Sequence, residues 1–211
     1  MTVTRNDAAA AHVRGILLAA GASSRLGQPK QLLAFGGRPL VRHVAEQALA
    51  SRLAGLTVVV GHHAAEVSAA LDGLSAAVVE NPSYSLGQST SLRAGLLDFP
   101  ADGSAALVLL VDQPFVTPTL IDRLIALYQE SMALIVAPRC EGRRGNPVLF
   151  DRELIPELLT VVGDTGAREV ISRHRDQLVP LELTDDRAFQ DIDTWDDYRK
   201  LAPNPAIEPF Q

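Results

Sequence analysis

The chain has 211 residues, of which 47% are hydrophobic and 21% are charged, and its formal net charge is −6. This composition is typical of a globular protein, and the length predicts a single domain. The acidic balance disfavours a nucleic-acid-binding surface. Cys140 is the single cysteine, which excludes an internal disulfide and a metal cage built from several cysteines.

No segment predicts a membrane-bound or exported protein. The longest apolar run in the central region, residues 105–111, is far shorter than the ~18 residues that span a bilayer. The alanine-rich N-terminus lacks an apolar segment long enough for a secretory signal. We therefore expect a cytoplasmic protein with neither a membrane nor a nucleic-acid partner.

Strands and helices are predicted to alternate along the first two thirds of the chain. Short apolar runs predict strands at 13–20, 56–60, 76–79, 106–111 and 133–137. Apolar residues at helical spacing predict helices at 40–52, 64–71 and 91–97. Thr117 followed by Pro118 predicts the cap and first turn of a further helix that runs to about Tyr128.

The last third of the chain is less regular. Residues 143–190 predict one strand at 147–150, two short helices and a strand near 178–183. A final helix is expected at 195–201, followed by a poorly ordered tail at 203–211. Repeated strand–helix units predict an α/β protein, with a parallel sheet covered by helices on both faces.

The loop at residues 21–30 follows the first predicted strand, where ligands of open parallel sheets bind. Gly21 and Gly27 permit tight turns whose amides can face an anion, and Arg25 and Lys30 add two positive charges. The loop lacks both the Walker A and the GxGxxG pattern, which disfavours a nicotinamide dehydrogenase. The loop chemistry alone is therefore compatible with phosphate binding and with an ordinary surface loop.

Carboxylate side chains form a second candidate site in the sequence, and hydroxyl side chains form a third. Asp112 ends the most apolar predicted strand, and Asp193 lies 81 residues further along, with Asp191 as an alternative on the same strand face. Carboxylates at such positions can hold Mg²⁺, although Asp193 could instead cap the last helix. Residues 85–92 place small hydroxyl side chains before a helix, which suits a base or ribose, although Ser89 could simply cap that helix.

The segment LAAGASSRLGQPK, residues 18–30, resembles the signature of the molybdenum cofactor (MobA-like) nucleotidyltransferases, and it is closest to their cytidylyltransferase branch. That branch usually has methionine in place of Leu26. Six further blocks follow in family order over nearly the whole chain. They are GGRPL (36–40), NPSYSLGQSTSLRAGL (81–96), VDQP (111–114), GRRGNPVLF (142–150), GDTGAR (163–168) and DIDTWDDY (191–198).

The resemblance implies a three-layer α/β/α fold with a mostly parallel sheet, of the Rossmann-like nucleotide-diphospho-sugar transferase type. It implies one domain over residues 1–202, with a nucleotide-binding half at about 14–115 and an acceptor-binding half at about 116–202. It also implies roles for individual residues. These are Arg25 and Lys30 as catalytic residues, Ala19, Ala20, Gly21, Gly87 and Ser91 for the nucleotide, Arg144, Gly145, Asn146 and Gly166 for the acceptor, and Asp112 and Asp193 for Mg²⁺.

The activity implied is transfer of CMP from CTP to the phosphate of molybdopterin, with release of pyrophosphate and delivery of the product to a molybdoenzyme. A guanylyltransferase or a sugar-phosphate nucleotidyltransferase on the same fold is an alternative. The guanylyl branch tends to carry glycine at the position of Ala20 and aspartate at that of Pro29, which favours the cytidylyl branch. A nucleotide-binding module that delivers the cofactor without catalysis is the non-enzyme alternative.

Overall fold

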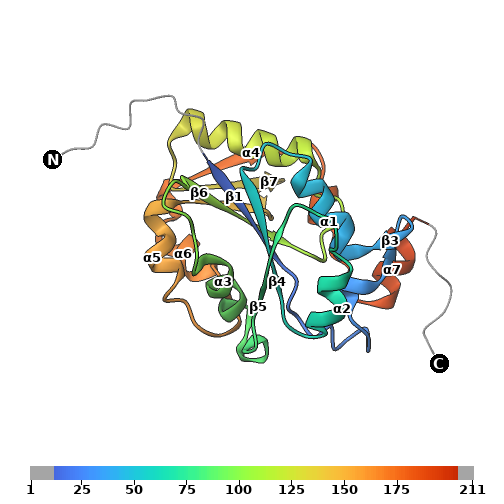
Figure 1. Ribbon diagram of the computed structural model, residues 1–211. Helices are drawn as coiled ribbons and strands as arrows, with labels where there is room; N and C mark the ends of the chain where they lie inside the picture. Colours follow the sequence, from blue (N-terminus) through green and yellow to red (C-terminus); the bar gives the residue numbers. More distant parts are fainter. Residues whose placement is uncertain (1–11, 204–211) are drawn as a thin grey trace.

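The computed structural model describes residues 12–203, so most of the predicted tail lies outside the described residues. A twisted sheet of eight strands crosses the molecule, in the order β10-β7-β9-β6-β1-β4-β5, with β8 paired to β7 (Figure 1). The strands are β1 (Val13–Leu18), β4 (Gly55–Val60), β5 (Ala77–Glu80), β6 (Ala105–Leu110), β7 (Ile135–Cys140), β8 (Arg143–Arg144), β9 (Val148–Asp151) and β10 (Leu178–Glu182).

The sheet is mostly parallel, as predicted. β1 runs parallel to both β4 and β6, and β10 runs parallel to β7. The exceptions are β9, which is antiparallel to β6 and β7, and the short β8. A separate two-stranded hairpin, β2 (Ala34–Phe35) with β3 (Arg38–Pro39), was not predicted, because each strand is too short to show a periodicity.

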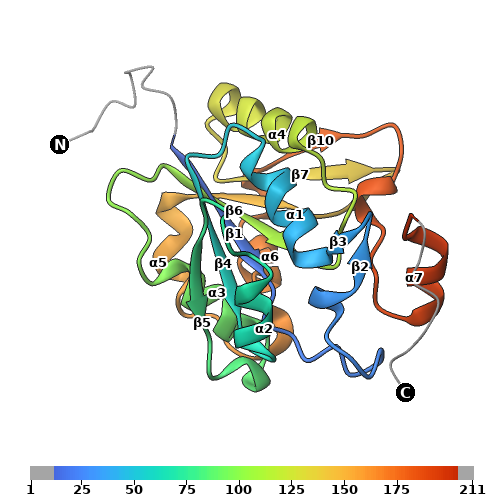
Figure 2. The ribbon, with the colours of Figure 1, turned by 45° about the vertical axis from the view of Figure 1, so that its right-hand side comes forward.

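Helices cover both faces of the sheet. They are α1 (Leu40–Leu49), α2 (Ala64–Ala69), α3 (Gln88–Leu96), α4 (Pro118–Ser131), α5 (Ile155–Leu158), α6 (Arg168–Arg173) and α7 (Trp195–Leu201). Figures 1 and 2 show α1 and α4 on one face, and α3, α5 and α6 on the other. None of the helices in residues 12–203 is long and apolar enough to cross a membrane.

Two buried clusters of apolar side chains lie on the two faces of the sheet. In β1, Val13 and Leu17 join the cluster under α1 and α4, whereas Ile16 and Leu18 join the cluster under α3, α5 and α6. Successive side chains of a strand point to opposite faces, so a strand that is apolar throughout is buried on both. The predicted three-layer α/β/α architecture is confirmed.

Two of the helix caps that the sequence left open are not formed in the structure. Helix α3 begins at Gln88 after Gly87, so Ser89 lies inside the helix and does not cap it. Helix α7 is capped by Thr194, whose hydroxyl accepts from the backbone N–H of Asp197, so Asp193 is not the cap. The predicted cap at Thr117 is confirmed, because its hydroxyl accepts from the backbone N–H of Leu120 at 3.2 Å.

Candidate active site

The loop at residues 21–30 is folded back on itself by the side chain of Gln31. Gln31 is fully buried, and its amide nitrogen Nε2 donates to the carbonyl oxygens of Ala19 and Gly21, each at 2.8 Å. The hydroxyl of Ser23 accepts from the backbone N–H of Lys30 at 3.0 Å. These bonds hold the start and the end of the loop together, so the charged side chains of Arg25 and Lys30 project from a fixed backbone. No sequence signal pointed to Gln31.

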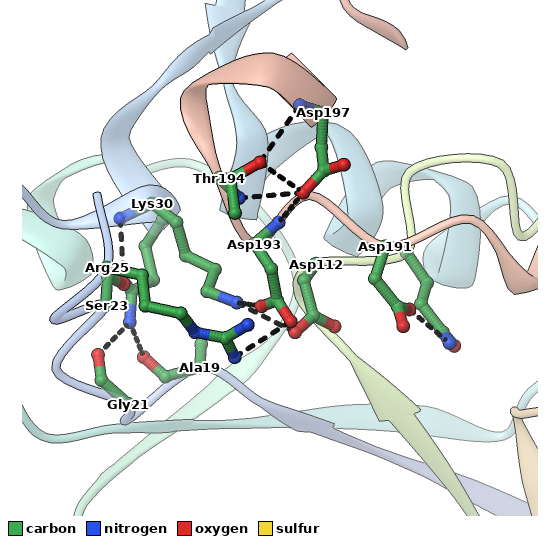
Figure 3. A network of polar contacts seen from close by, with 12 residues as sticks. Ala19, Gly21, Ser23, Arg25, Lys30, Asp112, Asp191, Asp193, Thr194 and Asp197 are labelled. Atoms are coloured by element: carbon green, nitrogen blue, oxygen red, sulfur yellow. Dashed lines mark hydrogen bonds and ion pairs between the residues drawn. The ribbon is translucent and has the colours of Figure 1, made fainter. Parts of the chain in front are cut away.

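The fold brings Asp112 and Asp193 together on one lysine. The ammonium nitrogen of Lys30 lies 2.9 Å from Asp112 Oδ2 and 2.6 Å from Asp193 Oδ1, as Figure 3 shows. Arg25 joins the group through a hydrogen bond of 3.0 Å from its guanidinium to Asp193 Oδ2. The backbone supports this arrangement, because the N–H of Ile192 donates to the carbonyl oxygen of Asp112 at 2.9 Å. Four of the predicted site residues therefore form one ionic network.

The charges in this network stabilise one another. Burial disfavours the charge of Lys30, but the carboxylates of Asp112 and Asp193 outweigh it and raise the pKa of the ammonium above its usual value. Burial also acts against the charge of Asp193, but Lys30 and Arg25 hold the pKa of this carboxyl below its usual value. Both groups are therefore ionised at neutral pH.

Asp191 lies beside this network but takes a different role. Gln113 Nε2 donates to Asp191 Oδ1 at 2.8 Å. Burial raises the pKa of the Asp191 carboxyl, and the neighbouring charges of Asp112 and Asp193 add to the effect. Asp191 forms no hydrogen bond or ion pair with Lys30 or Arg25, so the pair that shares the lysine is Asp112 with Asp193.

One carboxylate oxygen of this site is suited to bind a divalent cation. Asp112 Oδ1 is buried and has no hydrogen-bond partner, although a buried carboxylate oxygen normally finds one. Hard cations such as Mg²⁺ take carboxylate oxygens and usually keep several waters, so one or two carboxylates suffice. Among residues 12–203, no group of three or more His, Cys, Asp or Glu side chains could hold a metal. A metal here would therefore depend on Asp112 and Asp193, with its other ligands from water or substrate.

A cleft of about 530 Å³ opens between the loop, α3 and the ends of β1 and β6. Six of the predicted residues line it, namely Ala20, Gly21, Lys30, Gly87, Ser91 and Asp112. Ala19 does not line it, because Ala19 is fully buried behind the loop and gives its carbonyl oxygen to Gln31. The lining of the cleft therefore combines small side chains with larger ones such as Tyr84, and it includes a lysine and a carboxylate.

The fold requires glycine at one of the two glycine positions of this cleft but not at the other. Gly87 has a φ of +112°, and a Cβ there would lie 2.6 Å from the carbonyl oxygen of Gly163, so the fold itself requires glycine. A Cβ on Gly21 would meet no protein atom within 4 Å. The space beside Gly21 is therefore free for a ligand that approaches the backbone closely.

The buried Asn81 orients the start of α3 against the cleft. Its amide nitrogen Nδ2 donates to Thr90 Oγ1 at 2.8 Å and to Ser91 Oγ at 3.0 Å. Its side-chain oxygen accepts from the backbone N–H of Ser83 at 3.0 Å. No site role is predicted for Asn81 from the sequence, although an asparagine before a proline at the end of a strand is a recognisable turn signal.

A second cavity of about 210 Å³ adjoins the cleft, and Leu18, Gln88 and Leu110 line both. All four residues predicted for the acceptor line this second cavity, namely Arg144, Gly145, Asn146 and Gly166. Gly145 packs against the ring of Phe189, where a side chain would not fit. The structure thus places two neighbouring cavities over the same edge of the sheet.

Comparison with known proteins gives the family. Residues 15–178 match the MobA-like NTP transferase domain. The chain is 36% identical over 203 residues to nicotine blue oxidoreductase of Paenarthrobacter nicotinovorans, covering 90% of this chain and 96% of the relative. It is also 30% identical to the purine catabolism protein PucB of Bacillus subtilis strain 168, covering 87% and 93% of the two chains.

Solved structures agree with this match. Rv0371c from Mycobacterium tuberculosis H37Rv superposes with a TM-score of 0.82 at 31% identity, covering 91% of this chain and 98% of that one. The same protein in complex with manganese gives a TM-score of 0.75 at 30% identity, with coverage of 90% and 98%. The motif resemblance seen in the sequence is confirmed, and the chain belongs to the family of the MobA-like NTP transferase domain, with its Rossmann-like α/β fold.

Proposed function

We propose that this MobA-like nucleotidyltransferase transfers CMP from CTP to the phosphate of a molybdopterin-type acceptor and releases pyrophosphate. The observation that carries the proposal is the network of Lys30, Asp112 and Asp193 at the edge of the cleft. It combines a cation for phosphates with a buried, unpartnered carboxylate oxygen suited to a metal. The second cavity next to the cleft provides room for an acceptor.

The nucleotide is assigned to the cleft beside Gly21. Small side chains at Ala20, Gly87 and Ser91 leave space for a pyrimidine base and a ribose, and Gly21 lets the triphosphate approach the backbone. Within the proposed division of the domain, residues 14–115 supply all of the lining of this cleft except Asp164. Ala20 and Pro29 favour CTP over GTP, because the guanylyl branch tends to carry glycine and aspartate at these two positions.

The reaction is a substitution at the α-phosphorus of the nucleotide. An oxygen of the acceptor phosphate forms a new bond to that phosphorus, and the bond to the bridging oxygen of the β-phosphate breaks, so that pyrophosphate leaves with the electron pair. Arg25 and Lys30 stabilise the negative charge that builds on the leaving group. Because the two cavities share Leu18, Gln88 and Leu110, the bound substrates lie side by side, which lowers the entropic cost of the encounter.

Asp112 and Asp193 are proposed to hold Mg²⁺. When bound, the ion withdraws charge from phosphate oxygens and makes the α-phosphorus more electrophilic. The manganese complex of Rv0371c supports a divalent cation in a related chain. In the present structure the ammonium of Lys30 donates to both carboxylates, and its third N–H remains for a phosphate oxygen. The product is proposed to pass to a molybdoenzyme in the cytoplasm.

An oxidoreductase is a second candidate, because the relative that is 36% identical over 90% of this chain is a nicotine blue oxidoreductase. The residues at the cleft disfavour hydride transfer from a nicotinamide cofactor. The loop lacks the GxGxxG pattern of dinucleotide-binding folds, and its edge carries a lysine between two carboxylates. Incubation with a reduced nicotinamide cofactor and a dye acceptor tests this candidate, since oxidation of the cofactor at a catalytic rate would favour it.

The proposed function is tested by pyrophosphate release with each of the four ribonucleoside triphosphates, with and without molybdopterin and Mg²⁺. We expect release with CTP only when acceptor and metal are both present. Thermal unfolding with equal concentrations of CTP and GTP gives an independent measure, because the nucleotide bound more tightly raises Tm further. A preference for GTP in both measurements would assign the protein to the guanylyl branch. Binding of CTP without any release would favour the delivery module.

A further inference from the structure

Two arginines line the second cavity without a carboxylate partner. Arg144 comes from β8, and Arg168 is the first residue of α6. Among residues 12–203, neither side chain forms an ion pair. Arg144 is partly buried, and the one hydrogen bond that its side chain forms within those residues is a long one, 3.5 Å, to the carbonyl oxygen of Gly145.

Neighbouring arginines differ in this respect. Arg143, on the same short strand, pairs with Asp186 at 2.7 Å, and Arg173, on the same helix as Arg168, pairs with Glu157 at 2.6 Å. The chain is acidic overall, with 25 Asp and Glu against 19 Lys and Arg, so carboxylates are available. The two arginines of the cavity are thus an exception within their own elements.

The two guanidinium groups also act on each other. Burial lowers the pKa of Arg144, and the positive charge of Arg168 lowers it further, so the two side chains are close enough to repel. Like charges that face a common cavity raise the free energy of the empty protein. An anion placed between them would remove the repulsion and accept hydrogen bonds from both forks.

Apolar side chains also line the cavity, among them Leu92, Val148, Phe150 and Ile171. A ligand that fills the cavity would therefore carry a negative group and a part that packs against apolar side chains. A phosphate monoester carries about −1.5 to −2 charges at neutral pH, which matches two guanidinium groups better than a single carboxylate does.

We propose that Arg144 and Arg168 form a clamp for the phosphate group of the acceptor, whose ring system packs against the side chains of Leu92, Val148, Phe150 and Ile171. The inference rests on the proposed function and adds Arg168 to its acceptor site. The acceptor phosphate and the triphosphate repel each other, because they occupy cavities that share Leu18, Gln88 and Leu110. The positive charges of the clamp offset this repulsion. Arg168 thereby acts as a binding residue.

The test measures binding of phenyl phosphate, which has a dianionic phosphate and an apolar ring, by isothermal titration calorimetry. We expect Arg168→Gln to weaken binding about tenfold or more, since hydrogen bonds to charged groups are of that strength. Arg168 is exposed, so its replacement leaves the fold intact. Arg144→Gln should weaken binding in the same way. Arg143→Gln is the matched control, because Arg143 is occupied by Asp186, and it should bind as the unmodified protein does.

Further probes separate the clamp from the nucleotide cleft. Benzoate should bind about tenfold more weakly than phenyl phosphate, because it carries one charge instead of two. Lys30→Ala should leave the affinity for phenyl phosphate unchanged. The clamp is refuted if phenyl phosphate does not bind the unmodified protein, if Arg168→Gln binds it equally well, or if Lys30→Ala alone abolishes binding.

The proposed clamp and the proposed function can be refuted independently of each other. If no nucleotide supports pyrophosphate release but binding of phenyl phosphate depends on Arg168, the proposed function is wrong and the anion site stands. If release with CTP occurs and Arg168→Gln leaves both phenyl phosphate affinity and the KM for the acceptor unchanged, the function stands and the clamp is wrong.

Discussion

The ammonium nitrogen of Lys30 lies 2.6 Å from Asp193 Oδ1, although the two residues are 163 positions apart in the chain. The same nitrogen lies 2.9 Å from Asp112 Oδ2, so one cation joins the loop after β1, the turn after β6 and the segment before α7. Three segments of the candidate site therefore meet at a single atom, and replacing that atom is the most direct test of the site.

Lys30→Met should reduce kcat by about 10²–10³-fold, because loss of one preorganised donor to a developing charge costs about 3–4 kcal/mol. The nonpolar replacement keeps most of the side-chain length. Lys200→Met is the matched control, since Lys200 is the one other lysine of the chain and lies on the exposed side of α7. Pyrophosphate release by the two variants, with circular dichroism to confirm folding, makes the measurement. A Lys30→Met protein that is folded and fully active would refute the assigned role.

Asp112→Asn should abolish metal-dependent turnover and weaken binding of Mn²⁺, because the amide keeps the size of the side chain but removes its charge. The buried and unpartnered Oδ1 is the atom expected to bind the cation. Electron paramagnetic resonance of free Mn²⁺ measures the affinity without any need for turnover. Asp98→Asn, a change at an exposed carboxylate after α3, serves as the control. Equal Mn²⁺ affinity in Asp112→Asn and in the control would exclude Asp112 as a ligand.

Replacing two glycines of the cleft by alanine should separate binding from folding. Gly21→Ala should leave Tm nearly unchanged, because the added methyl group meets no atom within 4 Å, but it should weaken nucleotide binding. Gly87→Ala should destabilise the protein by at least 1–3 kcal/mol, roughly the cost of a strained backbone conformation, because its Cβ would also collide with the backbone of Gly163. Thermal unfolding with and without CTP measures both effects. Unchanged CTP affinity in Gly21→Ala would place the triphosphate elsewhere.

His174 should make the stability depend on pH near neutrality. Hydrogen bonds to Gln177 and to the carboxylate of Glu157, which lies 2.7 Å from Nε2, raise the pKa of His174 above its usual value of 6.5. A raised pKa in the folded state adds stability that is fully present below about pH 6.5 and is lost as the pH rises through the folded pKa. Because both side chains are still in partial contact with solvent, the effect is small.

The measurement compares the unmodified protein with His174→Gln in urea, about one pH unit below 6.5 and about two units above it. The difference in the free energy of unfolding should be larger at the lower pH. A difference that is equal at both values, or larger at the higher one, would contradict this account.

Local signals in the sequence were sufficient for most of the elements. The apolar run at residues 13–20 predicted a buried strand, and β1 is covered by an apolar cluster on each face of the sheet. Thr117 and Pro118 predicted the start of α4, because a cap and a first-turn proline act within four residues. The order of the motifs also predicted the family. These features depend only on residues that are close together in the sequence, so they can be recognised without the tertiary structure.

The tertiary structure alone decided which distant residues meet. Nothing in the sequence relates Gln31 to the carbonyl oxygens of Ala19 and Gly21, and nothing in it places Arg168 in the same cavity as Arg144. The sheet order brings the turn after β6 beside the loop after β1, because these two strands are neighbours. The hydrogen bond from Ile192 to Asp112 then adds the segment before α7. Such meetings result from strand pairing and packing over the whole domain, whereas periodicity and capping extend over only a few residues.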